Sequence, residues 1–589
     1  MEITVDLARD KLLSEQGSKL VRDYYLQDGE ESPQEAFARA STFFASNEEH
    51  AQRIYDAVSN LHFMFSSPIL SNAGTGNRGM PISCFLSYVP DTVEGLISHQ
   101  AETSWLSILG GGVGGHWSDV RAVSDKTVGI IPFTHTIDSA MTAYKQGKTR
   151  KGAYAAYLDV SHPDIEEFIT SRTPTGGDIN RKNFNSHHAV NITDDFMKAV
   201  YADWDWDLVC PHGGDVRSTV KARELWESML ETRHRTGEPF LNFIDTANQH
   251  LHPVQKKLGL KVHGSNLCNE IHLATDEQRT AVCCLLSLNL EKYDEWKNST
   301  LVEDLVEFLD NVLQYFIDNA PDCVAKAKYA AMRSRDIGIG AMGWHGYLMG
   351  KMIPFESIEA ERETYKIFRR IKEAAVEKSK TLAKERGSCP DAQEVGEVAR
   401  NLHLLAIAPN ANSSSICNAT ASVEPISSNA YSHRTRAGTD LIVNKYLVDF
   451  LYSKAPKSIE MLGSTKESWV QSQIEDVIEN EGSVQHLTYL TDHEKAVFKT
   501  FKEIDMHHVV SQAGIRQTFL CQGQSLNLRF DADADKGYVN SVHLSAYERG
   551  LKGLYYLRTG SVKKIDKVSS SLKDMSTEID TNECSACHA

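Results

Sequence analysis

Short apolar runs alternate with stretches of helical periodicity through the middle of the chain. Residues 208–210 and 281–290 are short and apolar, whereas residues 222–230 and 301–317 carry apolar side chains at helical spacing. Strands that alternate with helices usually build a sheet whose strands run mostly parallel. This alternation therefore favours an α/β fold with a largely parallel sheet.

The flanking segments differ from this central part. Residues 1–65 predict helices, because Pro33 stands near a helix start and apolar residues recur at roughly helical spacing. Residues 356–386 predict one long charged helix with an apolar seam, and residues 464–506 predict acidic, peripheral helices. Residues 560–589 are polar and lack an apolar face, which predicts a mobile tail.

The formal net charge of −17 over 589 residues argues against a polyanionic partner. Nucleic-acid polymers and anionic membranes attract basic surfaces, although a few backbone N–H groups can still hold one nucleotide phosphate. No run approaches eighteen apolar residues and Met1–Asp10 shows no secretory signal, so we expect neither a membrane span nor export. Eleven cysteines without an export signal favour a reducing, cytoplasmic environment.

The segment Ser265–Ile271 (SNLCNEI) combines an amide, a thiol and a carboxylate. In an extended chain alternate side chains share a face, so Asn266, Cys268 and Glu270 would point the same way. Successive same-face residues lie about 6.6 Å apart, which suits contact with one sugar-sized substrate. The three groups can bind hydroxyls, do sulfur chemistry and move a proton. A buried structural cysteine beside surface polar residues is the alternative.

The other notable cysteines fall into two groups. Cys84 and Cys283 lie in short apolar runs, where packing and chemistry are both compatible with the sequence, and sequence alone cannot pair them. Cys584 and Cys587 lie near the end of the polar tail, and closely spaced dithiols exchange readily with disulfides. C-x-x-C-H is also a haem-attachment pattern, but no export signal is present and one residue follows His588. Zinc needs more ligands than this tail supplies, so no metal site is expected.

Two flexible segments are candidates for phosphate binding. Residues 409–416 bring small hydroxyl and amide side chains, including Asn412, Ser413 and Ser414, to the start of a predicted helix. Residues 110–115 are too rich in glycine for a helix interior and predict a loop that exposes its backbone. An ordinary serine-rich capping loop is the alternative for residues 409–416, and a glycine-rich segment such as residues 110–115 is by itself a weak signal.

Two further patterns assign no function by themselves. Residues 145–152 (KQGKTRKG) form a basic, glycine-punctuated loop in an acidic protein, although a solvated surface loop has the same composition. Tyr555 and Tyr556 are adjacent, and adjacent tyrosines are usually packing residues.

In this order along the chain, the motifs resemble those of ribonucleotide reductase large subunits, and the resemblance runs from about Ser66 to the C-terminus. It implies a ten-stranded α/β barrel over residues 66–559, made of two parallel five-stranded halves. The loop that carries Cys268 would thread the centre of this barrel. The implied reaction is reduction of ribonucleotides to 2′-deoxyribonucleotides, with 5′-diphosphates favoured as substrates.

The resemblance implies a role for each catalytic candidate. Cys268 matches the cysteine that becomes a thiyl radical and abstracts the ribose 3′-hydrogen. Glu270 matches the base for the 3′-hydroxyl proton, and Asn266 matches the residue that orders the ribose hydroxyls. Cys84 and Cys283 match the thiols that reduce the 2′ position and end as a disulfide, with Cys84 as the proton donor.

The resemblance also implies partners. Tyr555 and Tyr556 match the stacked pair that relays an electron and a proton in class I enzymes, whose radical comes from a separate di-metal small subunit. Cys584 and Cys587 match the tail dithiol that passes on electrons from thioredoxin or glutaredoxin. No tightly bound cofactor is expected in this chain.

Nucleotide contacts are implied at two sites. Substrate contacts are expected at Ser67, Ser83, Gly114, Asn412, Ser413 and Ser414. Contacts to an effector (ATP, dATP, dTTP or dGTP) are expected at Asp91, Arg121, Gln146 and Arg150. In the family the effector site lies at the large-subunit dimer interface, so a nucleotide-dependent homodimer is expected. About sixty-five residues precede Ser66, so we expect no ATP-cone domain and no shut-off by dATP.

Two other interpretations remain open. A cobalamin-dependent class II reductase would use the same thiols without a small subunit and without the tyrosine relay. A non-catalytic nucleotide-binding or redox-relay protein would keep only the outline of the site. A class III enzyme would carry a glycyl-radical motif near its end, and the sequence has none there.

Overall fold

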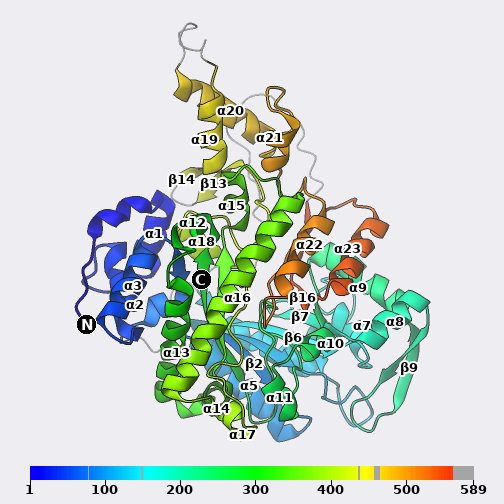
Figure 1. The fold of residues 1–589 in the computed structure, drawn as a ribbon. Coiled ribbons are helices and arrows are strands. Elements are labelled where there is room, and N and C mark those ends of the chain that lie inside the picture. Colours follow the sequence, from blue (N-terminus) through cyan, green and yellow to red (C-terminus); the bar gives the residue numbers. More distant parts are fainter. Residues whose placement is uncertain (77–78, 147–149, 436–437, 457–464, 561–589) are drawn as a thin grey trace.

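The structure is a computed structural model that describes residues 1–76, 79–146, 150–435, 438–456 and 465–560. Helices surround a central sheet, with a helical region on one side and a small helical projection at the top (Figure 1). No helix in the described ranges is both long and apolar enough to cross a membrane.

The chain begins with the helical region that the sequence predicts. Its helices are η1 (Leu7–Leu12), α1 (Glu15–Tyr24), α2 (Pro33–Phe44) and α3 (Glu48–Ser59). Helix α2 starts with a capping box, in which the side chains of Ser32 and Glu35 accept from backbone N–H groups of the first turn. Phe44 packs edge-to-face on Phe308 of α13 (Leu301–Asn319), which ties this region to the helices around the barrel.

Five parallel strands form the first half of the barrel. They are β2 (Cys84–Tyr88), β3 (Gly112–His116), β6 (Ala153–Asp159), β7 (His187–Ile192) and β10 (Phe240–Phe243). Each pairs in parallel with the next. Parallel neighbours need long crossovers, and helices occupy them. These helices are α5 (Val93–Ile108), α6 (Ile131–Ala143), α7 (Ile165–Ile169), α8 (Asp194–Ala202) and α9 (Ala222–Thr236).

The second half begins with β11 (Ala281–Asn289), in which every residue is buried. A strand that is covered on both faces has a continuous apolar sequence, which explains the unbroken run at residues 281–290. β11 pairs in parallel with β12 (Ile337–Met342). Parallel bridges then join Ile339 to Leu405 and Ile407 to Gln524, so two further segments extend this half.

Two antiparallel junctions close the barrel. β11 runs antiparallel to β2, and β16 (Gly553–Leu554) runs antiparallel to β10. The Tyr555 N–H donates to the Leu526 carbonyl at 2.9 Å and so joins the last two segments. The first half of the barrel consists of β2, β3, β6, β7 and β10. The second half consists of β11, β12 and three further segments, namely residues 404–407, 522–526 and 553–557. The predicted ten-stranded barrel of two parallel halves is confirmed.

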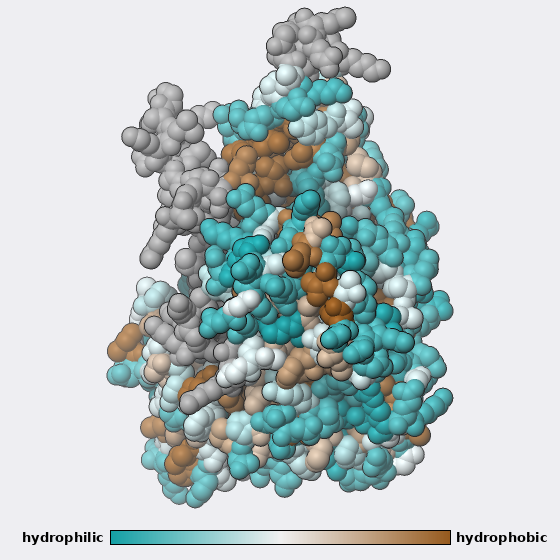
Figure 2. Space-filling view, turned by 90° about the vertical axis from the view of Figure 1, so that its left-hand side faces the viewer, coloured by the Kyte–Doolittle hydropathy of each residue, from teal (hydrophilic) through white to brown (hydrophobic). Residues whose placement is uncertain are grey.

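Helices outside the barrel match two further predictions. The long charged helix is α16 (Ile358–Arg386), which starts at its Ser357 cap and crosses the front of Figure 1. The projection at the top has a small core of its own and contains β13 (Ala430–Thr435), β14 (Gly438–Val443), α19 (Lys445–Lys454), α20 (Lys466–Glu479) and α21 (Asp492–Val497). Figure 2 shows an apolar area at the height of this projection, on a face that is otherwise mostly hydrophilic.

The remaining elements connect these parts or lie beside the barrel. They are β1 (Phe63–Phe65), α4 (Ser67–Asn72), η2 (Ile179–Arg181), α10 (Ile244–Gln249), α11 (Pro253–Lys257), η3 (Leu290–Lys292), α12 (Tyr293–Trp296), η4 (Asp322–Val324), α14 (Ala325–Ser334), α15 (Trp344–Gly350), α17 (Pro390–Glu394), α22 (Met506–Gln517), β15 (Leu528–Asp531), α23 (Lys536–Glu548) and β17 (Leu557–Gly560).

Two local predictions are wrong. Residues 110–115 are not all loop, because β3 begins at Gly112. A Cβ atom on Gly114 would lie 2.0 Å from the Ser265 carbonyl oxygen, so glycine here lets the strand lie directly against the central loop. Residues 208–210 do not join the parallel sheet; β8 (Asp205–Val209) forms an antiparallel hairpin with β9 (Val216–Lys221) outside the barrel.

Candidate active site

The segment Ser265–Ile271 lies inside the barrel, against glycines of both halves. A Cβ atom on Gly112 of β3 would lie 2.6 Å from the Leu267 side chain. One on Gly553 of β16 would lie 2.4 Å from the Asn269 side chain. The glycines therefore make the space through which this loop passes.

The loop is a tight turn, and the expected extended alternation is wrong. Asn269 has φ 62°, a left-handed conformation that asparagine tolerates better than most residues. The Asn266 side-chain oxygen accepts from the backbone N–H groups of Glu270 and Ile271, both at 3.1 Å. Asn266, Cys268 and Glu270 therefore come together because hydrogen bonds close the turn, and not because they alternate along a strand.

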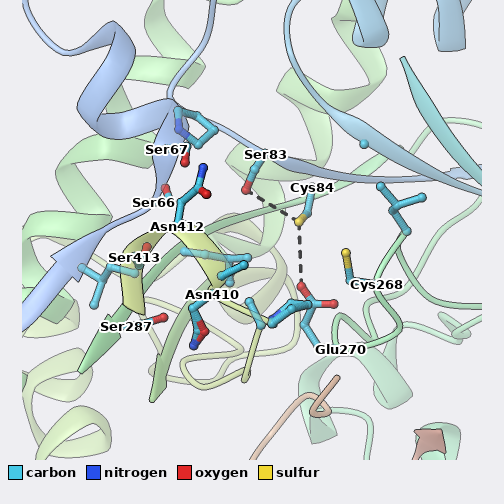
Figure 3. A pocket seen from close by; sticks show the side chains of 18 residues that line it. Ser66, Ser67, Ser83, Cys84, Cys268, Glu270, Ser287, Asn410, Asn412 and Ser413 are labelled. Atoms are coloured by element: carbon cyan, nitrogen blue, oxygen red, sulfur yellow. Dashed lines mark hydrogen bonds between the residues drawn. The ribbon is translucent and has the colours of Figure 1, made fainter. Parts of the chain in front are cut away.

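Cys84, Cys268 and Glu270 converge on one pocket (Figure 3). Asn266 Nδ2 donates to Cys84 Sγ at 3.3 Å, and Cys84 Sγ donates to Glu270 Oε1 at 4.0 Å. Ser83 Oγ lies 3.7 Å from the same sulfur. Cys84 and Cys268 are 7% and 8% exposed, so a ligand in the pocket would meet both thiols away from bulk water. The carboxylate can accept a proton from a bound sugar, and the thiols can exchange hydrogen atoms with its neighbouring carbon atoms.

Ser525 supports two of these groups, and sequence reasoning missed it. Its hydroxyl lies 2.6 Å from the Cys268 carbonyl oxygen and 3.0 Å from Glu270 Oε2. Ser525 is 1% exposed and comes from the second half of the barrel. It therefore joins the loop to the barrel wall at the site.

Cys283 lies directly opposite Cys84 in the antiparallel β2–β11 pair. Residues opposed in this way have Cα atoms about 4.5–5.5 Å apart, which is within the range of disulfides. Burial raises the pKa of the Cys283 thiol well above its usual value, and Cys284 and Cys84 add to the effect. Cys284 points outward, where its sulfur lies 3.6 Å from the Leu309 carbonyl oxygen of α13. Of the two adjacent cysteines, Cys283 is therefore the one that faces Cys84 across the strand pair.

An aromatic cluster lies on another side of Cys268. The ring centroids of Tyr555 and Tyr556 are 4.3 Å apart, and Phe240 lies 4.7 Å from the first and 4.9 Å from the second. Cys268 belongs to the same buried apolar cluster, together with small residues of β6 and β7 such as Ala155. The structure thus brings the two tyrosines and Cys268 together.

The other end of the pocket carries hydroxyl and amide groups. Of the residues expected to bind substrate, four line the pocket, namely Ser67, Ser83, Asn412 and Ser413. Gly114 does not line it and Gly112 does, because the central loop covers Gly114. Ser414 does not line it either, since its hydroxyl donates to the Ala411 carbonyl within α18 (Ala411–Ile416).

Further pocket residues were not among the expected substrate contacts. They are Ser66, Ser287 and Asn410. Ser66 Oγ and Asn410 Oδ1 are buried and have no hydrogen-bond partner among the described residues, so both can bind a ligand. Period-two alternation along β11 would have placed Ser287 on the Cys283 face. No local signal reveals Tyr25, whose hydroxyl lies 2.8 Å from Ser67 Oγ and brings the N-terminal helices to the pocket.

The expected effector residues lie elsewhere. Arg121 donates to Asp91 from its backbone N–H at 3.1 Å and from Nε at 2.9 Å. After α6, β4 (Lys145–Gln146) pairs with β5 (Arg150–Lys151), and Gln146 opposes Arg150 in this register. The side chains of Gln146 and Arg150 lie outside the described residues, and so do Cys584 and Cys587. Within the described ranges no three His, Cys, Asp or Glu residues gather as a metal site.

Fold and site together define an α/β-barrel enzyme built around a cysteine-bearing central loop. The family model for the ribonucleotide reductase barrel domain matches residues 82–396 and 392–557. The model for the ribonucleotide reductase all-alpha domain matches residues 11–78. The chain belongs to the family of ribonucleotide reductase large subunits.

Two viral relatives and one solved structure match this chain over nearly the whole length of both proteins. The chain is 53% identical to a putative ribonucleoside-diphosphate reductase large subunit of Frog virus 3, covering 93% of this chain and 94% of the relative. It is 41% identical to a ribonucleoside-diphosphate reductase large subunit of Invertebrate iridescent virus 3, covering 99% and 100%. A class Id ribonucleotide reductase alpha subunit of Actinobacillus ureae superposes with a TM-score of 0.81 at 32% identity, covering 94% and 98%.

Proposed function

We propose that this chain is the catalytic subunit of a cytoplasmic ribonucleotide reductase that converts ribonucleoside 5′-diphosphates into 2′-deoxyribonucleoside 5′-diphosphates. The observation that carries the proposal is the convergence of Cys84, Cys268 and Glu270 on one pocket, with Cys283 opposite Cys84. The names of the viral relatives support diphosphates as the substrate level.

The reaction begins at Cys268. As a thiyl radical, it takes the 3′-hydrogen atom of the ribose and becomes a thiol, leaving a radical at C3′. Glu270 accepts the 3′-hydroxyl proton, and Ser525 holds its other oxygen. Asn266 orders the ribose hydroxyls beside Cys84.

The two remaining thiols then reduce the 2′ position. Cys84 gives its proton to the 2′ oxygen, which leaves as water. Cys84 and Cys283 together lose two hydrogens and form a disulfide, while C2′ gains one hydrogen in place of the hydroxyl. Cys268 returns its hydrogen atom to C3′ and regains the radical, and Glu270 returns its proton to the 3′ oxygen. One substrate and two thiols therefore give one product, one disulfide and one water.

The radical reaches Cys268 from outside this chain. A di-metal small subunit supplies it through Tyr556 and Tyr555, and the chain needs no tightly bound cofactor of its own. The class Id alpha subunit among the solved relatives supports a class I enzyme. Cys584 and Cys587 reduce the buried disulfide after each turnover and are recharged by thioredoxin or glutaredoxin.

A homodimer would place the effector site between two copies. On α5, four large apolar side chains are 39–69% exposed and recur at helical spacing: Val93, Ile97, Trp105 and Ile108. Such a stripe marks an interface, and a second copy can cover it through a two-fold contact. Asp91 lies two residues before this helix, and with Arg121, Gln146 and Arg150 it would hold ATP, dATP, dTTP or dGTP.

A three-arm assay tests the proposal. The purified chain is given CDP, dithiothreitol and ATP, and dCDP is measured for the chain alone, with adenosylcobalamin, and with the di-metal subunit from the same source. We expect dCDP only in the third arm. Product with cobalamin alone would contradict the small-subunit relay, and nucleotide binding without product in any arm would favour a non-catalytic protein.

A further inference from the structure

A cluster of buried and partly buried polar side chains reaches the hydroxyl of Tyr556. His187, the first residue of β7, places Nδ1 3.2 Å from Tyr556 Oη. The same nitrogen lies 2.6 Å from Oε1 of Glu238, which stands just before β10. The chemistry proposed above uses neither His187 nor Glu238, although both lie beside the predicted tyrosine relay.

Glu238 is a buried carboxylate with several donors. Its side chain is 2% exposed, and burial alone would raise its pKa, but Arg172, His187 and His188 together hold the pKa well below the usual value. The backbone N–H and Nδ1 of His188 each lie 3.1 Å from Oε2, and Arg172 Nε lies 3.4 Å from the same oxygen. The group is therefore ionised and only accepts hydrogen bonds.

The direction of the hydrogen bonds follows from this charge. Because the Glu238 carboxylate cannot donate, the hydrogen in the 2.6 Å contact belongs to Nδ1 of His187. The same N–H also faces Tyr556 Oη, so the phenol oxygen is an acceptor in this contact. The neighbouring His188 also has acceptors beside its ring. Its Nδ1 lies beside Glu238 Oε2, and its Nε2 lies 3.0 Å from the Ile169 carbonyl oxygen.

Packing holds the His187 ring in this place. The ring stacks on Phe240 at 5.9 Å with an interplanar angle of 21°, and it stands at 82° to the Tyr556 ring. The Leu557 N–H donates to the Gly237 carbonyl oxygen at 3.1 Å, which ties the strand end after Tyr556 to the segment that carries Glu238. The segment whose Glu238 anchors the donor His187 is thus tied to the segment that carries the acceptor Tyr556.

We propose that His187, anchored by Glu238, is a positioning residue for Tyr556: its N–H occupies one acceptor direction of the phenol oxygen and directs the phenol hydrogen toward Tyr555. The inference rests on the proposed tyrosine relay. In that relay the Tyr555 O–H bond breaks and one hydrogen atom, a proton with its electron, forms the O–H bond of Tyr556 in place of its phenoxyl radical. The return transfer reverses this exchange, so no further oxidant is needed.

Two substitutions at His187 separate hydrogen bonding from packing. His187→Phe keeps a ring against Phe240 but has no N–H, whereas His187→Asn carries an amide N–H near the position of Nδ1. With the small subunit, we expect His187→Phe to lower kcat for CDP reduction about tenfold, the effect of one buried hydrogen bond, at unchanged KM. His187→Asn should recover most of this loss. Thermal unfolding and CDP binding verify that both variants fold.

A spectroscopic readout tests the hydrogen bond itself. With 3-aminotyrosine at position 556, the trapped radical should show a hydrogen coupling that disappears in D₂O and that His187 provides. We expect this coupling to be lost in His187→Phe and kept in His187→Asn. If His187→Phe does not fold, Glu238→Gln replaces it, and the coupling should then weaken because the anchor has lost its charge.

The outcomes distinguish this inference from the proposed function. Turnover and coupling in His187→Phe equal to the wild type would overturn the positioning role and leave the reductase intact. An equal loss of kcat in His187→Phe and His187→Asn would show a packing role and would also overturn it. Absence of turnover by the wild-type chain with its small subunit would overturn the proposed function, and with it this inference.

Discussion

Cys268 lies between two unlike surroundings. On the polar side, the thiol of Cys84 and the hydroxyl of Ser525 both lie within hydrogen-bond reach of the Glu270 carboxylate. On the aromatic side, Phe240 and the tyrosine pair are packed with small apolar residues. The cysteine is the residue that both sides share.

In the proposed function, the difference separates two tasks that would interfere in one space. Acid–base chemistry on a sugar needs donors and acceptors that can exchange protons, and the polar side has them. A radical that passes between side chains needs close contacts away from water, and the buried rings of the aromatic side offer these. A substitution on one side should therefore leave the task of the other side intact.

The largest effect is expected where the two sides meet. Cys268→Ser keeps the shape of the side chain but replaces the sulfur, so neither task can be completed, and kcat for CDP reduction should fall by at least about a thousandfold. Effector and substrate binding should persist. Cys284→Ala is the matched control, because Cys284 is a buried cysteine that faces α13, and its kcat should stay within a few-fold of the wild type. Comparable losses in both variants would contradict a special role for Cys268.

On the aromatic side, Tyr556→Phe removes the exchangeable hydrogen and keeps the ring. We expect a fall in kcat of about two to three orders of magnitude, because the radical no longer reaches Cys268. The electron paramagnetic resonance signal of the small subunit should then persist after mixing with CDP and effector. Normal consumption of that signal would mean that radical transfer bypasses the tyrosine pair.

On the polar side, Glu270→Gln removes the base and keeps the shape. Loss of one general base typically costs about a hundredfold or more, and kcat should fall accordingly while CDP still binds. Radical delivery should continue, so the small-subunit signal should change on mixing as in the wild type. A signal that stays constant would show that the two sides are not independent.

The smallest effect is expected at Ser525, which touches the polar side alone. Ser525→Ala removes the contacts to Glu270 and to the Cys268 carbonyl and should lower kcat about tenfold, as expected for a buried hydrogen bond of about 1.4 kcal/mol. Ser511→Ala is the matched control, since that buried serine donates to Glu361 outside the barrel. Equal kcat values for both variants would remove Ser525 from the site.

Local sequence patterns determine a large part of this protein. The helix starts at Pro33 and Ser357, the apolar run of β11 and the closeness of Asn266, Cys268 and Glu270 in the chain are all readable because they involve residues a few positions apart. The motifs in their order also indicate the family and, through it, the ten-stranded barrel. The local elements and the family can both be recognised without knowledge of contacts between residues that are distant in the chain.

Tertiary structure alone decided how the site is assembled. The resemblance already implied Cys283 as the partner of Cys84, but only the register of β2 against β11 shows the two residues opposite each other. The glycine-rich segment pairs as strand β3, where Gly114 leaves room for the Ser265 carbonyl of the loop. Ser525 reaches Glu270 from the other half of the barrel. These contacts join residues far apart in the chain, and their partners are selected by barrel closure and packing, which no local propensity encodes.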